Sequence, residues 1–228
     1  MLFSFDNEND SIIDKDKYTQ IYIYDLGKSN IEIIIKNDFI FLINTGLEED
    51  REELLDYLDK LGIREIDYLI VTNKDDKYIG NLDFILEHFK VDYLYLNDYE
   101  YSSKYTKKVF EMLDGAYTED IILTSIENIR IDDLEIDIYP YMEDNFVMED
   151  KSLIINIREG KNSIYLTNNI SKKRFNEIKS STVLISENID ILEKNSNYYI
   201  YDGNSKIKKD ILKRNKEIFI NKKELIIK

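Results

Sequence analysis

The stretch from Ile70 to Asn81 reads IVTNKDDKYIGN, and it decides the fold that this sequence predicts. It opens inside a short apolar run, Tyr68 to Val71, of the kind found in buried strands. Polar and charged residues follow from Thr72 to Tyr78 and predict a loop. Apolar residues at helical spacing come next, so we expect a helix from about Gly80 to Phe89. The stretch therefore predicts a strand, a polar loop and a helix in succession.

The residues before this stretch predict antiparallel strands and one helix. Alternating side chains from Tyr18 to Tyr24 predict a strand. The runs Ile31–Lys36 and Phe39–Ile43 predict a hairpin that turns at Asn37-Asp38. A helix should then begin at Asp50, with Glu53 three residues further on at the spacing of a capping box, and should end before Gly62.

The residues after it repeat the pattern. A strand at Val91–Leu96 is followed by a helix that stops near Gly115. A hairpin turning at Glu159-Gly160-Lys161 lies in the second half. The other expected strands are Ile121–Leu123, Asn128–Ile131, Leu134–Tyr139, Val183–Ile185, Tyr198–Tyr201, Glu217–Ile220 and Leu225–Ile227, and the other expected helices are Lys172–Lys179 and Lys206–Arg214.

Each half thus starts with antiparallel strands and continues with alternating helices and strands. This order predicts an α/β fold, a four-layer αββα sandwich of two mixed β-sheets with helices outside. The chain has 228 residues, one Pro and no long Gly/Ser tract, so we expect one domain over residues 1–228, with residues 1–17 as an irregular N-terminal segment.

Composition narrows the function further. Acidic residues outnumber basic ones by 46 to 31, and the net charge of −15 makes nucleic acid an unlikely partner. The Lys-rich stretch from Lys206 to Lys223 is the one candidate for a local basic patch. Cysteine is absent, which excludes disulfides and thiolate ligands. We find neither a signal peptide nor an apolar run long enough to span a bilayer, so we predict a cytoplasmic protein without membrane insertion.

Several segments together resemble the metallo-β-lactamase superfamily. The stretch from Thr72 to Asn81 is similar to its T-H-x-D-x-D-H-I-G-G segment, and Leu42–Gly46 is similar to L-I-D-T-G. Asp25–Asn30 resembles the D-V-G-Q-G-D turn of the ComEC-type branch, the hydrolase-like domain of bacterial DNA-uptake channels. Ser152–Ile157 and Tyr165–Ile170 resemble S-L-V-L-R-L and L-L-T-G-D-I in the second half. The resemblance covers nearly the whole chain from Tyr18.

The same alignment indicates that the zinc ligands of the family are missing. Asn73 stands at the position of the first His, Lys77 at that of a metal-binding Asp, and Tyr78 at that of the following His. Asp75 occupies a position that is already Asp in part of the family, and Asn169 replaces the bridging Asp. Ser186-Glu187-Asn188 stands where a later H-H-G segment should follow. The whole chain contains one His, so a multi-His site is excluded in any register.

We therefore expect no cofactor, no metal ligands and no catalytic residues of the zinc-hydrolase kind. The sole histidine, His88, lies off the apolar stripe near a helix end, where it is expected to be a surface residue. Asp75 and Asp76 offer oxygen ligands for Mg²⁺ or Ca²⁺, but Lys74 and Lys77 flank and neutralise them, so a solvated loop is the favoured interpretation.

Three functions remain open. The first is an inactive interaction or scaffold module that binds an unknown protein partner or associates with itself. The second is a pseudoenzyme that binds a small ligand in the cleft left by the lost active site. The third is a hydrolase with altered, non-zinc chemistry. The residues expected to line that cleft are Asn44, Asn73, Asp75, Asp76, Lys77, Tyr78, Asn169 and Asp202.

Overall fold

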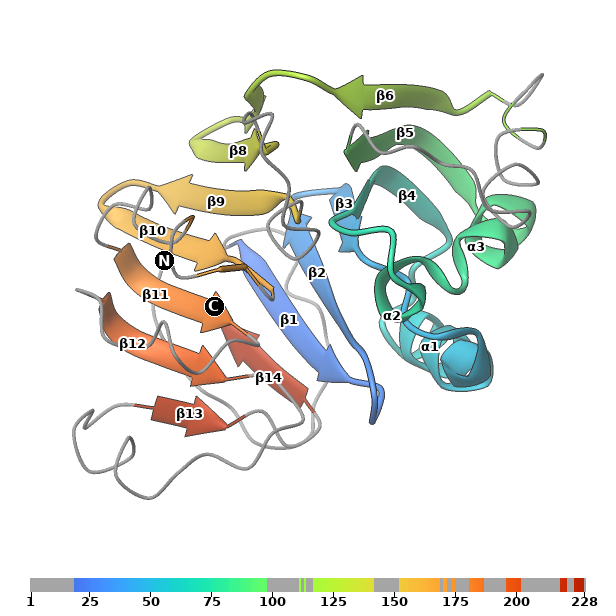
Figure 1. The fold of residues 1–228 in the computed structure, drawn as a ribbon, viewed down its shortest axis with the longest axis horizontal. Helices are drawn as coiled ribbons and strands as arrows, with labels where there is room; N and C mark the ends of the chain where they lie inside the picture. Colours follow the sequence, from blue (N-terminus) through green and yellow to red (C-terminus); the bar gives the residue numbers. More distant parts are fainter. Residues whose placement is uncertain are drawn as a thin grey trace. The chain divides into compact units, whose positions relative to one another are not determined.

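The structure is a computed structural model. It describes residues 19–97, 111, 113, 117–141, 152–168, 170–171, 174, 181–186, 196–201, 218–220 and 224–227. The predicted N-terminal segment 1–17, Asn169 and Asp202 lie outside the described residues, as does most of each of three predicted helices, those ending near Gly115 and at Lys172–Lys179 and Lys206–Arg214. The chain divides into two compact units, one that runs to Leu123 and also includes residues 223–228, and one that runs from Thr124 to residue 222 (Figure 1).

The first unit is built on a seven-stranded mixed sheet in the order β14-β1-β2-β3-β4-β5-β6. Strands β14, β1, β2 and β3 pair antiparallel, and β3 to β6 pair parallel. The strands are β1 (Gln20–Asp25), β2 (Asn30–Lys36), β3 (Phe39–Ile43), β4 (Glu65–Val71), β5 (Lys90–Asn97), β6 (Glu119–Leu123) and β14 (Glu224–Ile227).

One face of this sheet is covered by short helices. These are the 3₁₀-helix η1 (Glu48–Asp50) and the α-helices α1 (Arg51–Lys60), α2 (Asp76–Ile79) and α3 (Leu82–His88). Apolar side chains of α1 and α3 pack with those of the sheet into one buried cluster, which includes Leu54, Leu58, Leu82, Ile33 and Leu69. This burial, rather than helix propensity, stabilises elements as short as these. No helix in the described part of the chain is long and apolar enough to cross a membrane.

The second unit repeats the strand plan. Its sheet has the order β13-β12-β11-β10-β9-β8-β7, with β7 to β10 antiparallel and β10 to β13 parallel. The strands are β7 (Glu127–Ile131), β8 (Leu134–Tyr139), β9 (Ile154–Glu159), β10 (Asn162–Leu166), β11 (Ser181–Ser186), β12 (Ser196–Tyr201) and β13 (Ile218–Ile220). Both halves therefore join an antiparallel hairpin to parallel strands, as the sequence predicted.

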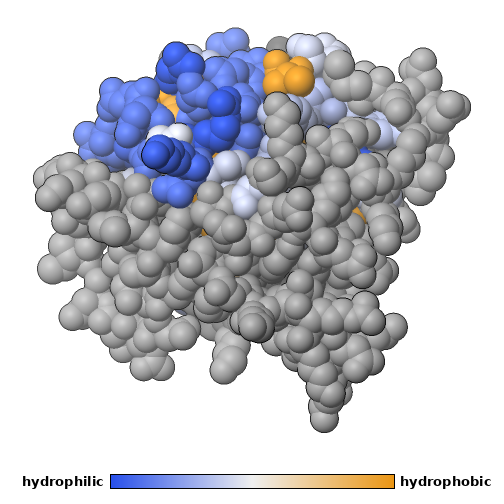
Figure 2. All heavy atoms as spheres, turned by 90° about the vertical axis from the view of Figure 1, so that its left-hand side faces the viewer, coloured by the Kyte–Doolittle hydropathy of each residue, from blue (hydrophilic) through white to orange (hydrophobic). Residues whose placement is uncertain are grey.

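Charged residues cover one side of the antiparallel strands in this unit. Arg158 forms ion pairs with Glu135 at 2.8 Å and with Asp137 at 2.7 Å, and Arg130 pairs with Glu135. Figure 2 shows one side of the molecule, turned by 90° from the view of Figure 1, and most of the described residues visible there are hydrophilic.

The tight turns follow the predicted chemistry. Asn37, with φ of 54°, turns the β2–β3 hairpin, in which Lys36 pairs with Phe39. In the second unit Glu159 pairs with Asn162, so the turn consists of Gly160-Lys161 alone, and Gly160 has φ of 60°. Two-residue hairpins favour such positive φ values, which Asn and Gly adopt at low cost.

Two local predictions were wrong. The predicted capping box is absent, because Asp50 makes no side-chain cap and its carboxylate accepts a 2.6 Å hydrogen bond from the Ser29 hydroxyl. Glu53 instead accepts a hydrogen bond from the Tyr24 hydroxyl. The segment Thr72–Tyr78, expected to be a loop, contains the start of helix α2, whereas the helix expected from about Gly80 to Phe89 is present as α3.

Candidate functional site

The candidate site lies in the first unit, where β3 and β4 end side by side. Because these strands are parallel, the residues after them meet at one edge of the sheet. Asn44 follows β3 in the left-handed conformation, with φ of 64°, and its backbone N–H donates to Ile70 O at 2.8 Å. Its side-chain oxygen Oδ1 accepts from the N–H and the hydroxyl of Thr72 at 3.0 and 2.7 Å. Asn44 and Thr72 are both buried, so this amide joins the two loops.

A second set of hydrogen bonds closes the loops further along the chain. The Thr45 N–H donates to Tyr78 O at 2.8 Å, and the Asn81 N–H donates to the Thr45 hydroxyl at 3.2 Å. The Asn81 side-chain amide donates to the carbonyls of Thr45 and Leu47 at 2.9 and 2.5 Å. Arg51 Nε donates to Asn81 Oδ1 at 3.2 Å, which ties α1 to the same point. Asn81 is fully buried and connects its own loop to the loop after β3 and to α1.

The segment from Asn73 to Tyr78 divides into buried and exposed residues. Asn73 is buried, and its Oδ1 accepts the Asp75 N–H at 3.1 Å, in a turn that leads into α2. Asp75 and Asp76 are exposed, and Lys77 is half-buried. The Tyr78 side chain is buried, and Lys77 Nζ lies 4.6 Å from the centroid of its ring, within the range of a cation–π contact.

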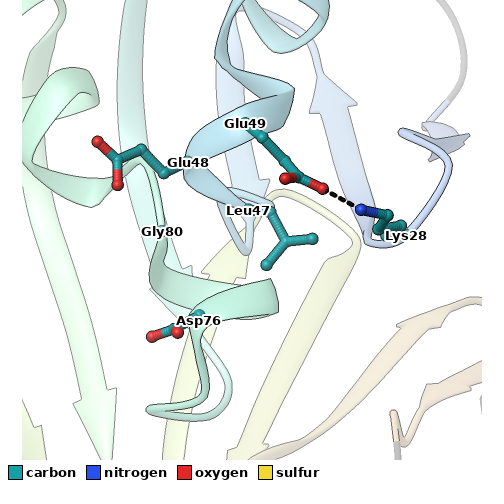
Figure 3. Close-up of a pocket in the computed structure, with 6 residues that line it drawn as sticks. All are labelled: Lys28, Leu47, Glu48, Glu49, Asp76 and Gly80. Carbon is teal, nitrogen blue, oxygen red and sulfur yellow. Dashed lines mark hydrogen bonds and ion pairs between the residues drawn. The ribbon is translucent and has the colours of Figure 1, made fainter.

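A pocket of about 680 Å³ lies beside this segment (Figure 3). Among the described residues, Asp76 is the one predicted site residue that lines it, together with Lys28, Leu47, Glu48, Glu49 and Gly80. Lys28 and Glu49 form an ion pair at 2.5 Å, and the hydrogen bond and charge of Glu49 raise the pKa of Lys28. The acidic pair Glu48-Glu49 ahead of α1 was the available signal for this pocket, but acidic residues are too frequent in the chain for that pair to stand out.

The sole histidine lies at the opposite end of the parallel strands. His88 is exposed, its ring stacks on Phe84 with centroids 3.9 Å apart, and Nδ1 lies 3.0 Å from Phe84 O. It precedes Lys90, which pairs with Glu65 at the start of β4, whereas Asn73 follows the end of that strand. A seven-residue strand spans roughly 20 Å. His88 therefore contributes nothing to the loops around Asn73.

The corresponding loops of the second unit are built alike. The Thr167 N–H donates to Ile185 O at 3.1 Å, and the Ser186 hydroxyl donates to Asn168 O at 3.1 Å. Asn168, like Asn44, has a positive φ, of 47°. Both units thus follow the first parallel strand with a left-handed Asn that is bonded to the end of the next strand.

Known proteins with similar sequences or structures identify the fold of this chain. No protein-family model matches the chain. ComE operon protein 3 of Bacillus subtilis (strain 168) is 27% identical over 129 residues, which cover 55% of this chain and 16% of that protein.

Solved structures match nearly the whole chain, among them the following three. The metallo-β-lactamase fold protein YhfI of Bacillus subtilis matches 92% of this chain and 99% of its own, with a TM-score of 0.63 and 11% identity. Zn²⁺-bound PqqB of Methylobacterium extorquens matches 91% and 99%, with a TM-score of 0.66 and 10% identity. A diphosphatase of the PhnP family matches 91% and 97%, with a TM-score of 0.61 and 14% identity.

The chain has the metallo-β-lactamase fold. The predicted α/β sandwich of two mixed β-sheets is confirmed. At these identities the likeness concerns the fold, and chemistry has to be argued from the side chains.

In this metallo-β-lactamase fold, the loop after β4 does not fit a zinc ion. The Asn73 side-chain oxygen already accepts the Asp75 N–H, and an amide is a weak ligand beside an imidazole. The Lys77 ammonium contributes a positive charge next to the Tyr78 ring. Within the described residues, no three His, Cys, Asp or Glu side chains group closely enough to hold a metal ion.

The structure thus brings together part of the predicted cleft. Asn44, Asn73 and Tyr78 are buried in the loops after β3 and β4, whereas Asp75 and Asp76 face solvent. Thr45, Thr72 and Asn81 were not predicted as members, although they make most of the hydrogen bonds. Their roles depend on contacts about 30 residues apart in the chain, which no local pattern reveals.

Proposed function

We propose that this chain is a metallo-β-lactamase-fold module that binds another protein and does not catalyse zinc-dependent hydrolysis. The observation that carries the proposal is the loop after β4, where Asn73, Lys77 and Tyr78 take part in turn formation and packing. Without an imidazole, thiolate or carboxylate set, a zinc ion is not retained, and no bound water has its pKa lowered to form a hydroxide nucleophile.

We further propose that the chain derives from the ComEC-like branch of the superfamily. The match to ComE operon protein 3 supports this relationship over 129 residues. The match spans only 16% of that protein, so the activities of the rest of that protein are not carried over to this chain. The cytoplasm is the proposed compartment, since the sequence has no Cys and needs no oxidising environment.

Metal analysis of the purified chain tests the proposal directly. After incubation with Zn²⁺ and gel filtration, we expect zinc well below one ion per chain, and no hydrolysis of bis(p-nitrophenyl) phosphate with added Zn²⁺ or Mn²⁺. Stoichiometric zinc that disappears in the Asn73→Ala variant would refute the proposal. The combined Lys77→Asp and Tyr78→His substitutions should restore neither zinc binding nor hydrolysis, because the second half of the sequence also lacks the residues expected as ligands.

A small-ligand pseudoenzyme is the second candidate, and one atom favours it. Asn44 Nδ2 is buried and has no hydrogen-bond partner within the described part of the chain. A buried donor of this kind costs about 1–3 kcal/mol unless an acceptor reaches it. Mass spectrometry of the denatured protein would then find a co-purifying molecule that Asn44→Asp, which turns the donor into an acceptor, no longer retains. If the wild-type chain carries no molecule, this candidate is excluded.

A further inference from the structure

Strand β6 forms one edge of the sheet in the first unit (Figure 1). Among the described strands it pairs only with β5, in parallel, from Tyr93 opposite Glu119 to Asn97 opposite Leu123. The Thr118 hydroxyl donates to Val91 O at 2.8 Å and fixes the start of the strand. Within the part of the chain that the structure describes, the strand therefore presents a preformed row of backbone donors and acceptors along its outer side.

The side chains of this edge are unusually apolar in its second half. Ile122 is 38% exposed on the side of the sheet that packs against the helices, and Ile121 is half-buried on the other side. Tyr117, just before the strand, is fully exposed. Natural edge strands are usually protected by charged side chains, Pro or bulges, and the half of β6 formed by Ile121, Ile122 and Leu123 carries no charged residue and no Pro.

The first half of the strand is acidic. Glu119 and Asp120 are both exposed, one on each side of the sheet. Association of two copies, each with a net charge of −15, is opposed by long-range repulsion. A basic partner meets no such repulsion and compensates both carboxylates, so charge complementarity favours a basic segment over a second copy.

We propose that the outer edge of β6 binds an extended segment of a partner protein as an additional strand. The proposal deepens the function proposed above by naming the surface through which an interaction module would act. Because antiparallel pairing is slightly the more stable, the incoming segment runs against β6. Its residues opposite Leu123, Ile122 and Ile121 are aliphatic, and those opposite Asp120 and Glu119 are basic. The partner motif is thus three aliphatic residues followed by two basic ones.

A labelled heptapeptide, Thr-Val-Ile-Val-Lys-Lys-Thr, tests the proposal by fluorescence anisotropy with the full chain. We expect saturable binding with one peptide per chain, and slower amide hydrogen exchange in β6 when the peptide is present. Ile122→Lys should weaken binding roughly tenfold or more, because it places a positive charge opposite an aliphatic residue and repels the basic residues of the peptide. Phe39→Lys is the matched control, since Phe39 is also 38% exposed but lies on β3, three strands away.

Several outcomes would overturn the proposal. Equal binding of the basic peptide to Ile122→Lys and to wild type would show that β6 is not the binding site. Binding of Thr-Val-Ile-Val-Glu-Glu-Thr as tight as that of the basic peptide would show that the charges of Glu119 and Asp120 are not recognised. Binding of a peptide N-methylated at alternate residues with undiminished affinity would exclude strand pairing. A dimer in sedimentation that Ile122→Lys dissociates would make a second copy the occupant. Zinc content, measured on the same samples, tests the proposed lack of zinc binding independently of peptide binding.

Discussion

Asn81 is the side chain that holds the candidate site together. It is fully buried, donates to two carbonyls from the loop after β3, and accepts from Arg51. Asn81→Ala removes the side-chain donor to the buried Thr45 carbonyl, at a cost of about 1–3 kcal/mol, and also removes the hydrogen bonds to Arg51 and to Leu47 O, which keeps the Asp50 N–H. We therefore expect the free energy of unfolding to fall by roughly 2–4 kcal/mol in urea titrations followed by circular dichroism.

Asp76→Ala provides the control for this substitution. Asp76 lies in the same loop but is exposed, so its removal should change the free energy of unfolding by less than about 0.5 kcal/mol. Equal destabilisation by the two variants would show that the loop unfolds locally and that the buried hydrogen bonds contribute little.

Asp67 predicts a pH dependence of stability. Burial, and to a lesser degree the charge of Asp92, raise the pKa of its carboxyl above the ordinary value of 3.8. The folded state then binds the proton more tightly than the unfolded state, so the free energy of unfolding falls as the pH rises from 3.8 through the raised pKa. In the wild-type chain the Ile40 N–H donates to Asp67 Oδ2 at 2.8 Å. Asp67→Asn keeps an oxygen that can accept this hydrogen bond and abolishes the contribution of Asp67 to the pH dependence of stability.

The measurement is a pair of urea titrations at about pH 4 and pH 7 for wild type and Asp67→Asn. Other titrating groups cancel in the difference between the two proteins. We expect the variant to gain stability relative to wild type as the pH rises. A difference that is constant with pH would contradict the assignment to Asp67.

At Gly80, which follows α2, the backbone lies very close to that of the loop after β3. A Cβ atom there would lie 2.6 Å from Glu48 N, 2.7 Å from Gly46 O and 2.8 Å from Asp76 O, all backbone atoms. Gly80→Ala should therefore force the loops apart and lower the free energy of unfolding by about 1–3 kcal/mol. Thermal unfolding measures the effect, and Gly160→Asn is the control. Gly160 has open space around it and a positive φ that Asn tolerates, so a similar loss there would argue against steric crowding at Gly80.

At this scale of single elements, the sequence predicted the strands better than the helices. Alternation and turn residues such as Asn37 and Gly160 are local signals, and they identified the hairpins. Helix α2 was missed because it has four residues and depends on contacts with the loop after β3, such as Tyr78 O with Thr45 N–H. The capping box failed for the same reason, since Ser29, distant in the chain, binds the Asp50 carboxylate. Part of the site was found through the resemblance, whereas Asn81 becomes a member only once the loops are folded.

At the scale of the whole molecule, the net charge of −15 opposes binding to nucleic acid. Binding to duplex DNA is dominated by the release of counterions from phosphates by Lys and Arg, and this chain carries 46 acidic against 31 basic residues. A field of this sign repels the duplex at long range and lowers the rate of encounter. The same field attracts basic segments, which is the preference proposed for the edge of β6.

We therefore predict that the chain does not bind a fluorescent 20-base-pair duplex with a dissociation constant tighter than about 10⁻⁴ M at roughly 150 mM salt. Fluorescence anisotropy measures this, and the basic heptapeptide serves as the positive control under the same conditions. Tighter binding with a steep salt dependence would reveal a basic patch strong enough to overcome the net charge. The Lys-rich stretch from Lys206 to Lys223 would then be the candidate, and Lys208→Glu with Lys209→Glu should abolish that binding. Tight binding that survives these substitutions would show that net charge is a poor guide to the partners of this chain.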